Sequence, residues 1–110
     1  MAYLYVIRCQ GDTLYTGIAT DIGRRMREHM EQGSRCAKYT RTHKIQRLEA
    51  FWQVDTYAHA AKGEWAVKRL PKIKKEALIR EPEKLADFCP NLGEYPFVPQ
   101  KPVPLSSFYR

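Results

Sequence analysis

The first nineteen residues place the strongest constraint on the fold of this 110-residue chain. YLYVIRC alternates and is rich in aromatic and β-branched residues, QGD supplies turn residues, and TLYTGI resumes the alternation, which predicts a β-hairpin. A two-residue turn would put Tyr5 and Tyr15 on opposite faces. A three-residue loop over 10–12 instead pairs Tyr5 with Gly17 and Tyr15 with Ile7, and the glycine leaves space beside Tyr5. We predict this odd loop, or an equivalent bulge, with both tyrosines on one face.

An amphipathic helix of about three turns is predicted next, over TDIGRRMREHMEQG. Its apolar residues recur at helical spacing between a capping residue and a glycine stop. The apolar residues are Ile22, Met26 and Met30, the cap is Thr20 or Asp21, and the stop is Gly33. The basic stretch SRCAKYTRTHKI lacks periodicity and is predicted to be a long loop, and QRLEAFWQVD is predicted to be a third strand.

Two further helices and an irregular tail are predicted in the second half. Asp55 or Thr56 would cap a helix through YAHAAKGEWAVKRL, which must end at Pro71, and KIKKEALIR would start a basic helix on that proline. Residues 81–110 hold six of the seven prolines, a density that argues against regular structure, but they are too aromatic for a typical linker. We expect an α/β (α+β) domain over residues 1–80, a three-stranded antiparallel sheet flanked by helices, with a proline-rich extension over 81–110 packing on it.

Charge and cysteine content narrow the class of protein. The net charge is +7, and residues 1–80 carry 16 basic and 8 acidic side chains, which favours a polyanionic partner. An odd number of scattered cysteines and no signal pattern predict a reduced, cytoplasmic protein. No apolar run approaches the roughly 20 residues that a membrane span needs. No zinc-like spacing links Cys9, Cys36, His43 and His59.

A set of polar residues follows the hairpin in a fixed order. Arg25 comes ten residues after Tyr15, and His29 shares a helix face with Arg25. With Tyr3-Leu4-Tyr5 as a first motif and Tyr15-Thr16-Gly17 as a second, the sequence resembles the GIY-YIG nuclease family. The later GEWAVKRLPKIKKEALI is similar to the family's helix with a metal-binding glutamate, here Glu64. The resemblance covers roughly residues 2 to 80 and is closest to small stand-alone members.

The resemblance implies a role for each of these residues in phosphodiester hydrolysis. Tyr5 and Tyr15 would handle the attacking water, Arg25 the scissile phosphate and His29 a supporting place in the relay, and Glu64 would hold one Mg²⁺ or Mn²⁺. Such a reaction needs a deprotonated nucleophile and charge neutralisation at the phosphate. Only about a thousandth of a free tyrosine is ionised at pH 7, so Tyr5 would be a base only if a cation stabilised its phenolate. A lone carboxylate suits Mg²⁺, which keeps most of its waters.

Each residue also has an ordinary structural interpretation. A strand tyrosine usually packs, a helix histidine is usually a satisfied structural residue, and Glu64 and Lys68 have the spacing of a surface ion pair. Against the last, Ala60, Glu64 and Val67 share one helical face. The basic runs are usually solvated faces, but beside a phosphate-cleaving site we interpret them as DNA contacts. The predicted nucleic-acid-binding residues are Arg24, Arg35, Lys38, Tyr39, Arg41, Lys68, Lys72 and Lys75.

Three functions remain open on the sequence. The first is a metal-dependent DNA endonuclease acting on branched, nicked or single-stranded DNA in repair or recombination, with a targeting protein. The second is a nucleic-acid-binding module that cleaves poorly or not at all, because Tyr3 replaces the family's first glycine and the family's later asparagine is missing near Ile79, with Asn91 far downstream. The third is a protein-interaction domain that uses the aromatic tail.

Overall fold

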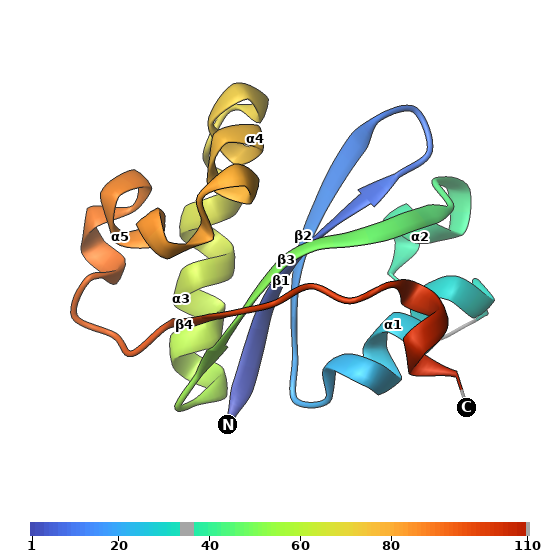
Figure 1. Cartoon of the computed structure of the whole chain (residues 1–110), viewed down its shortest axis with the longest axis horizontal. Coiled ribbons are helices and arrows are strands. Elements are labelled where there is room, and N and C mark those ends of the chain that lie inside the picture. The colour runs from blue at the N-terminus through green and yellow to red at the C-terminus, as the bar shows by residue number, and fades with distance from the viewer. Residues whose placement is uncertain (34–36, 110) are drawn as a thin grey trace.

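The computed structural model describes residues 1–33 and 37–109, and an antiparallel sheet forms its centre (Figure 1). The strand order is β2-β1-β3-β4. The strands are β1 (Ala2–Cys9), β2 (Thr13–Ala19), β3 (Ile45–Val54) and β4 (Val98–Gln100). The predicted sheet of three strands is therefore wrong by one. Pro99 sits in β4 opposite Trp52, a position open to proline because an edge strand need not donate every backbone N–H to the ladder.

Helices cover both faces of the sheet (Figure 1). The side with the C-terminus carries α1 (Ile22–Glu31) and α2 (Lys38–Thr42), and the other side carries α3 (Tyr57–Lys68), α4 (Lys72–Arg80) and α5 (Leu85–Phe88). Three 3₁₀ turns complete the tail: η1 (Pro82–Lys84), η2 (Pro90–Leu92) and η3 (Leu105–Phe108). The helix α2 lies where a loop was predicted. None of the helices in the described ranges is long and apolar enough to cross a membrane.

The register of the N-terminal hairpin confirms the predicted odd loop. Tyr5 pairs with Gly17 and Ile7 pairs with Tyr15, so both tyrosines lie on the same face. The loop accommodates its tight turn with two consecutive left-handed residues, Gly11 at φ 78° and Asp12 at φ 57°. Sequence alternation and turn chemistry together thus place the two phenols on the face that α1 covers.

Alternation along β1 separates two apolar clusters. Tyr5, Ile7 and Cys9 pack with Met26 of α1 on one face. Leu4 and Val6 pack on the other face with α3, α4 and the tail. Each face of the central strand therefore anchors a different helix layer, and the edge strand β2 lies between them.

The observed caps explain where the helices begin and end. Asp21 caps α1 by accepting a hydrogen bond from the backbone N–H of Arg24 at 3.1 Å, and Thr56 caps α3 in the same way. Gln32, at φ 54°, ends α1 in the left-handed conformation, so the predicted stop at Gly33 is one residue late. Pro71 forms the N-cap of α4. The caps fix the start of the helix that carries Arg25 and His29.

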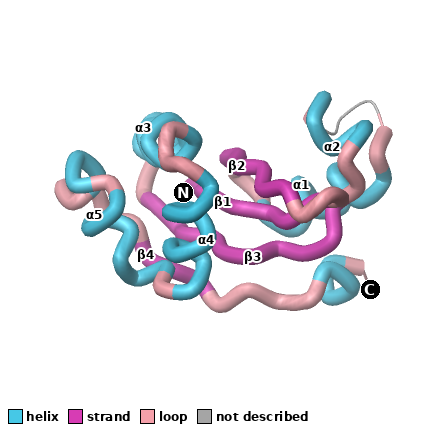
Figure 2. Tube along the Cα trace, turned by 90° about the horizontal axis from the view of Figure 1, so that it is seen from above, coloured by secondary structure: helices cyan, strands magenta, loops and turns pink. Residues whose placement is uncertain are grey.

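The tail contacts both layers of the molecule. Leu85, Cys89 and Leu92 are buried in the cluster around α3 and α4. After β4 the chain runs along the edge of β3 toward α1 (Figure 2). There Phe108 packs against the α1 cluster and its carbonyl accepts a hydrogen bond from Arg27 at 3.1 Å. The extension thus contacts α1 as well as the layer of α3 and α4.

Candidate active site

The ring of Tyr5 lies directly over Gly17 of the neighbouring strand. A Cβ built on Gly17 would lie 2.6 Å from Cζ of Tyr5 and 3.1 Å from Cε2 of Tyr15, so a side chain there would displace both rings. The space that the glycine was predicted to leave is filled by the Tyr5 ring itself. The Tyr5 hydroxyl contacts His29 and Arg25 of α1 from this position beside the edge strand β2.

A hydrogen-bond chain runs from Tyr5 through α1 to α2. The Tyr5 hydroxyl is 2.7 Å from Nε2 of His29, and Nδ1 of His29 is 2.8 Å from Oγ1 of Thr40. The Thr40 hydroxyl donates its one proton to the carbonyl of Ala37 at 3.1 Å. Thr40 must therefore accept from Nδ1–H, which leaves the Nε2 lone pair to accept the Tyr5 proton. The geometry sets the direction of every proton in the chain.

Burial keeps both ring systems of this chain neutral. Desolvation raises the pKa of Tyr5 well above its ordinary value and outweighs the nearby Arg25 cation, whose Nε is 3.4 Å from the Tyr5 hydroxyl. Desolvation, reinforced by the charge of Arg25, lowers the pKa of His29 to about 4. Arg25 also forms a 2.8 Å ion pair with Glu28. At neutral pH the resting site thus holds a protonated Tyr5 and a neutral His29 whose Nε2 is a proton acceptor.

Tyr15 forms the second aromatic wall of the site. Its ring lies 6.5 Å from that of Tyr5 and meets His29 edge-on at 5.8 Å. Tyr39 of α2 stacks on Tyr15 at 5.7 Å, so this predicted nucleic-acid contact belongs to the wall of the site. The ammonium of Lys68 lies 5.5 Å from the Tyr15 ring centroid. The helix α3 therefore reaches around the edge of the sheet to the tyrosine face.

Glu64 joins the site from α3. Its charge adds to the high pKa of Tyr5, and its carboxylate pairs with Lys68 at 3.3 Å. Within the described ranges no group of three or more His, Cys, Asp or Glu side chains is arranged to hold a metal ion. A single carboxylate is the donor set of a hydrated hard cation that completes its shell with water and phosphate oxygens, so Glu64 fits Mg²⁺ and not a site closed by protein ligands.

The predicted nucleic-acid-binding residues divide between the two helix layers. Arg24 is exposed on α1 and borders a pocket of about 260 Å³ that Arg25 and Glu28 also line. On the other layer, burial and the charge of Lys68 lower the pKa of Lys75, so these two ammonium groups lie near one another. The ammonium of Lys72, on α4, instead contacts Asp12 in the hairpin loop. Lys38 and Arg41 are exposed on α2, and Arg35 lies outside the described residues.

Thr40 is the residue of this site that the sequence did not reveal. It falls in a stretch without periodicity, and α2, which positions it, has only five residues and no side-chain cap. Its burial and its two hydrogen bonds become visible only when α2 packs against α1. Nothing in KYTR distinguishes this threonine from Thr42 two residues later.

Comparison with known proteins identifies the family of the chain. The sequence model of the GIY-YIG catalytic domain matches residues 1–77. The chain belongs to the GIY-YIG family. Domains of this family are generally nucleases that use divalent metal ions, and their substrates are nucleic acids. The residues of the hydrogen-bond chain and Glu64 all lie within the matched part, whereas β4, α5 and the 3₁₀ turns lie outside it.

Several relatives of the GIY-YIG chain are UPF0213 proteins. The UPF0213 protein H16_B0156 of Cupriavidus necator is 44% identical over 79 residues, 72% of this chain and 84% of that protein. FN1575 of Fusobacterium nucleatum is 37% identical over 81 residues, 74% of this chain and 79% of that protein. The solution NMR structure of BH0048 from Bacillus halodurans is similar with a TM-score of 0.47 at 34% identity, covering 78% of this chain and 94% of that one.

Proposed function

We propose that this GIY-YIG chain is a metal-dependent endonuclease that hydrolyses DNA phosphodiester bonds at the Tyr5 hydroxyl. The observation that carries the proposal is the directed hydrogen-bond chain from Tyr5 through His29 to Thr40, with Arg25 beside the Tyr5 hydroxyl. Nicked, branched and single-stranded DNA, as formed in repair or recombination, are the proposed substrates. A separate protein would direct so small a domain to them.

The proton path follows from the resting state of the chain. As a water molecule attacks phosphorus, the Tyr5 oxygen takes a proton from the water and passes its own proton to Nε2 of His29. His29 becomes an imidazolium that still donates from Nδ1 to Thr40. Tyr5 thus relays a proton without becoming a free phenolate, which its burial would make costly. Proton transfer by a positioned group of this kind typically contributes 10²- to 10⁴-fold in rate.

Substrate itself would make His29 a better base. The positive charge of Arg25 is one cause of the low His29 pKa. A phosphodiester anion bound to Arg25 would offset that charge and allow the pKa of His29 to rise toward the working pH. Arg25 therefore has two effects, because its guanidinium also balances the charge that develops on the phosphate oxygens.

Glu64 would hold the divalent ion. When bound, such an ion neutralises charge on the phosphate and on the leaving oxygen. For this, Glu64 must exchange its pairing with Lys68, an exposed lysine, for the ion. Lys68 would then be available for a neighbouring phosphate, which agrees with its predicted role as a DNA contact.

A second candidate function is binding without efficient cleavage. It is supported by Tyr3 at the place of the family's first glycine, by the absence of an asparagine near Ile79, and by the Glu64–Lys68 pairing. In that case the basic side chains would bind nucleic acid on a scaffold that turns over poorly.

A cleavage panel separates the two functions. The protein and its Arg25→Ala and Glu64→Ala variants are incubated with nicked, branched, single-stranded and duplex DNA, with Mg²⁺ or Mn²⁺. Cleavage by the unaltered protein and its loss in both variants is the expected result. Equal cleavage by all three proteins would mean a contaminating nuclease, and binding without cleavage of any substrate would leave the binding module.

A further inference from the structure

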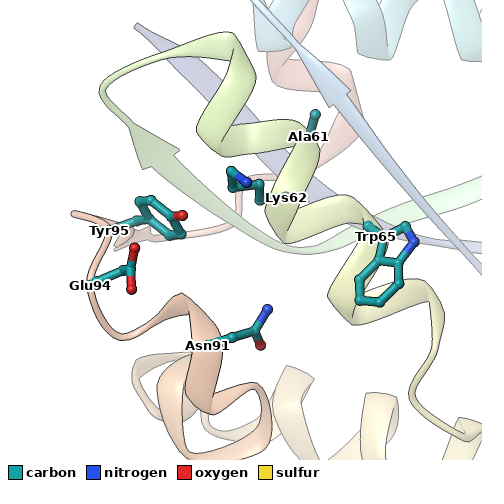
Figure 3. Close-up of a pocket in the computed structure, with 6 residues that line it drawn as sticks. All are labelled: Ala61, Lys62, Trp65, Asn91, Glu94 and Tyr95. Atoms are coloured by element: carbon teal, nitrogen blue, oxygen red, sulfur yellow. The ribbon is translucent and has the colours of Figure 1, made fainter.

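A pocket of about 480 Å³ lies between α3 and the C-terminal extension, outside the site described above (Figure 3). Its volume is within the usual range for small-molecule sites. One side comes from α3 and the other from residues beyond the end of the GIY-YIG match at residue 77. The lining residues are Ala61, Lys62, Trp65, Asn91, Glu94 and Tyr95.

Trp65 is the unusual residue of this pocket. Its side chain is 59% exposed, whereas Trp52, the other tryptophan, is fully buried. The guanidinium of Arg69 lies 4.2 Å from the centroid of the Trp65 ring and so holds the indole from one side. A large aromatic ring that is oriented by the protein yet left in solvent is typical of a stacking surface for a ligand.

The polar groups around Trp65 define the ligand. Asn91 offers an amide that both donates and accepts, and Glu94 offers a carboxylate that only accepts. Lys62 places a positive charge at the same pocket, which argues against a cationic ligand such as a methylated lysine. One nucleotide matches these groups. Its base would stack on Trp65, and the edge of the base would hydrogen-bond to Asn91 and Glu94. Its phosphate would pair with Lys62.

We propose that this pocket binds the base and phosphate of one unpaired nucleotide, and, where the proposed nuclease function holds, a nucleotide of the strand being cut. Trp65 directly follows Glu64 in α3, and successive helix residues point about 100° apart. The pocket therefore flanks the Tyr5 site without overlapping it. Guanine presents two adjacent N–H donors to a carboxylate, so Glu94 favours guanine over the other bases.

The two tryptophans make binding directly measurable. Because Trp52 is buried and donates to the carbonyl of Pro82 at 2.9 Å, quenching of tryptophan emission by an added nucleotide reports on Trp65. The four deoxynucleoside monophosphates are titrated first, and dGMP is expected to quench at the lowest concentration. Glu94→Gln should remove that preference.

Labelled DNA then distinguishes a free nucleotide from a strand as the source. The Glu64→Ala variant, which is not expected to cut, is titrated with a blunt duplex and with the same duplex carrying a three-nucleotide overhang. Adding Trp65→Leu should weaken binding of the overhang duplex by about 5- to 150-fold, the range for one stacked base, and leave the blunt duplex unchanged. Lys62→Ala removes the cation proposed for the phosphate and should also weaken binding of the overhang duplex, whereas Lys101→Ala, at an exposed lysine outside the pocket, is the matched charge control and should not.

The outcomes separate this proposal from the nuclease function. Quenching by mononucleotides alone, with equal binding of both duplexes, would assign the pocket to a free nucleotide and overturn its role in strand binding. No quenching by any nucleotide, with both duplexes insensitive to Trp65→Leu, would overturn the pocket altogether even if the unaltered protein cleaves DNA. Quenching and overhang binding in a protein that never cleaves would uphold the pocket and overturn the nuclease function.

Discussion

Two buried polar networks lie on opposite faces of β1. One holds a permanent charge, and the other is neutral. Arg8 is buried beside α4, where its guanidinium contacts carboxylates of Glu49, Glu76 and Asp12 at 2.6 to 2.9 Å. Tyr5 is buried beside α1 in a neutral chain. Hydrogen bonding to Glu76 raises the pKa of Arg8, which stays charged at every accessible pH.

The difference shows what each network is suited to do. The carboxylates around Arg8 come from the hairpin loop, β3 and α4, so the guanidinium ties together segments far apart in sequence. Arg8 keeps its protons, and the carboxylates around it neutralise its charge. In the Tyr5 chain both rings are neutral, and the Nε2 lone pair of His29 faces the Tyr5 hydroxyl proton. The first network is therefore suited to stability, whereas the proposed function uses the second for proton transfer.

Removing the Tyr5 hydroxyl should produce the largest effect on activity. Tyr5→Phe keeps the ring over Gly17 but deletes the atom that relays the proton, so kcat is expected to fall by about 10²- to 10⁴-fold. His29 Nε2 loses its donor, and the free energy of unfolding should fall by about 1 to 3 kcal/mol. Single-turnover cleavage and urea unfolding measure the two effects. A variant that cleaves within threefold of the unaltered protein would remove Tyr5 from the mechanism.

The neutral His29 should make the stability of the protein depend on pH. Its folded pKa of about 4 lies below the unfolded value near 6.5, so the unfolded chain binds more protons between these values. The contribution of His29 to the free energy of unfolding is then fully present above pH 6.5. It falls by about 3 kcal/mol as the pH drops to 4. Urea midpoints at pH 7, 5.5 and 4.5 test this against His29→Gln. A slope that persists in the variant would come from another group.

Weakening the Arg8 network should affect stability and not catalysis. Glu76→Gln removes the charge that pairs with both Nη atoms of Arg8, while Glu49 and Asp12 remain. The free energy of unfolding should fall by about 2 kcal/mol, less than the 3 to 5 kcal/mol typical when a buried charge loses its only partner. Cleavage per folded molecule should not change. Glu83→Gln, an exposed charge on the tail, is the control, and a large loss of kcat in Glu76→Gln would contradict the division between the two networks.

The sequence predicted those features of the site that depend on residues close together in the chain. The hairpin register follows from alternation and an odd loop, and the shared face of Arg25 and His29 from helical spacing. The strand β4 escaped prediction because Pro99 argues against a strand everywhere except at an edge, and the edge is defined only by the folded sheet. The Arg8–Glu76 pair joins residues 68 positions apart, and no periodicity marks such a contact.

The short helix α2 was not predicted because no periodicity in the sequence marks it. A substitution in α2 gives the prediction with the smallest expected effect and the most specific measurement. Thr40→Val keeps the shape of the side chain but cannot accept from Nδ1–H of His29, so part of the histidine should change to the Nε2–H tautomer, which cannot take the Tyr5 proton. Loss of one such hydrogen bond should lower kcat by about 10-fold with little change in KM. Nitrogen-15 NMR shifts of His29 report the tautomer directly, without DNA. Thr40→Ser retains the acceptor and should restore both the Nδ1–H signal and the rate, and a Thr40→Val protein with an unchanged His29 spectrum would show that another group orients the imidazole.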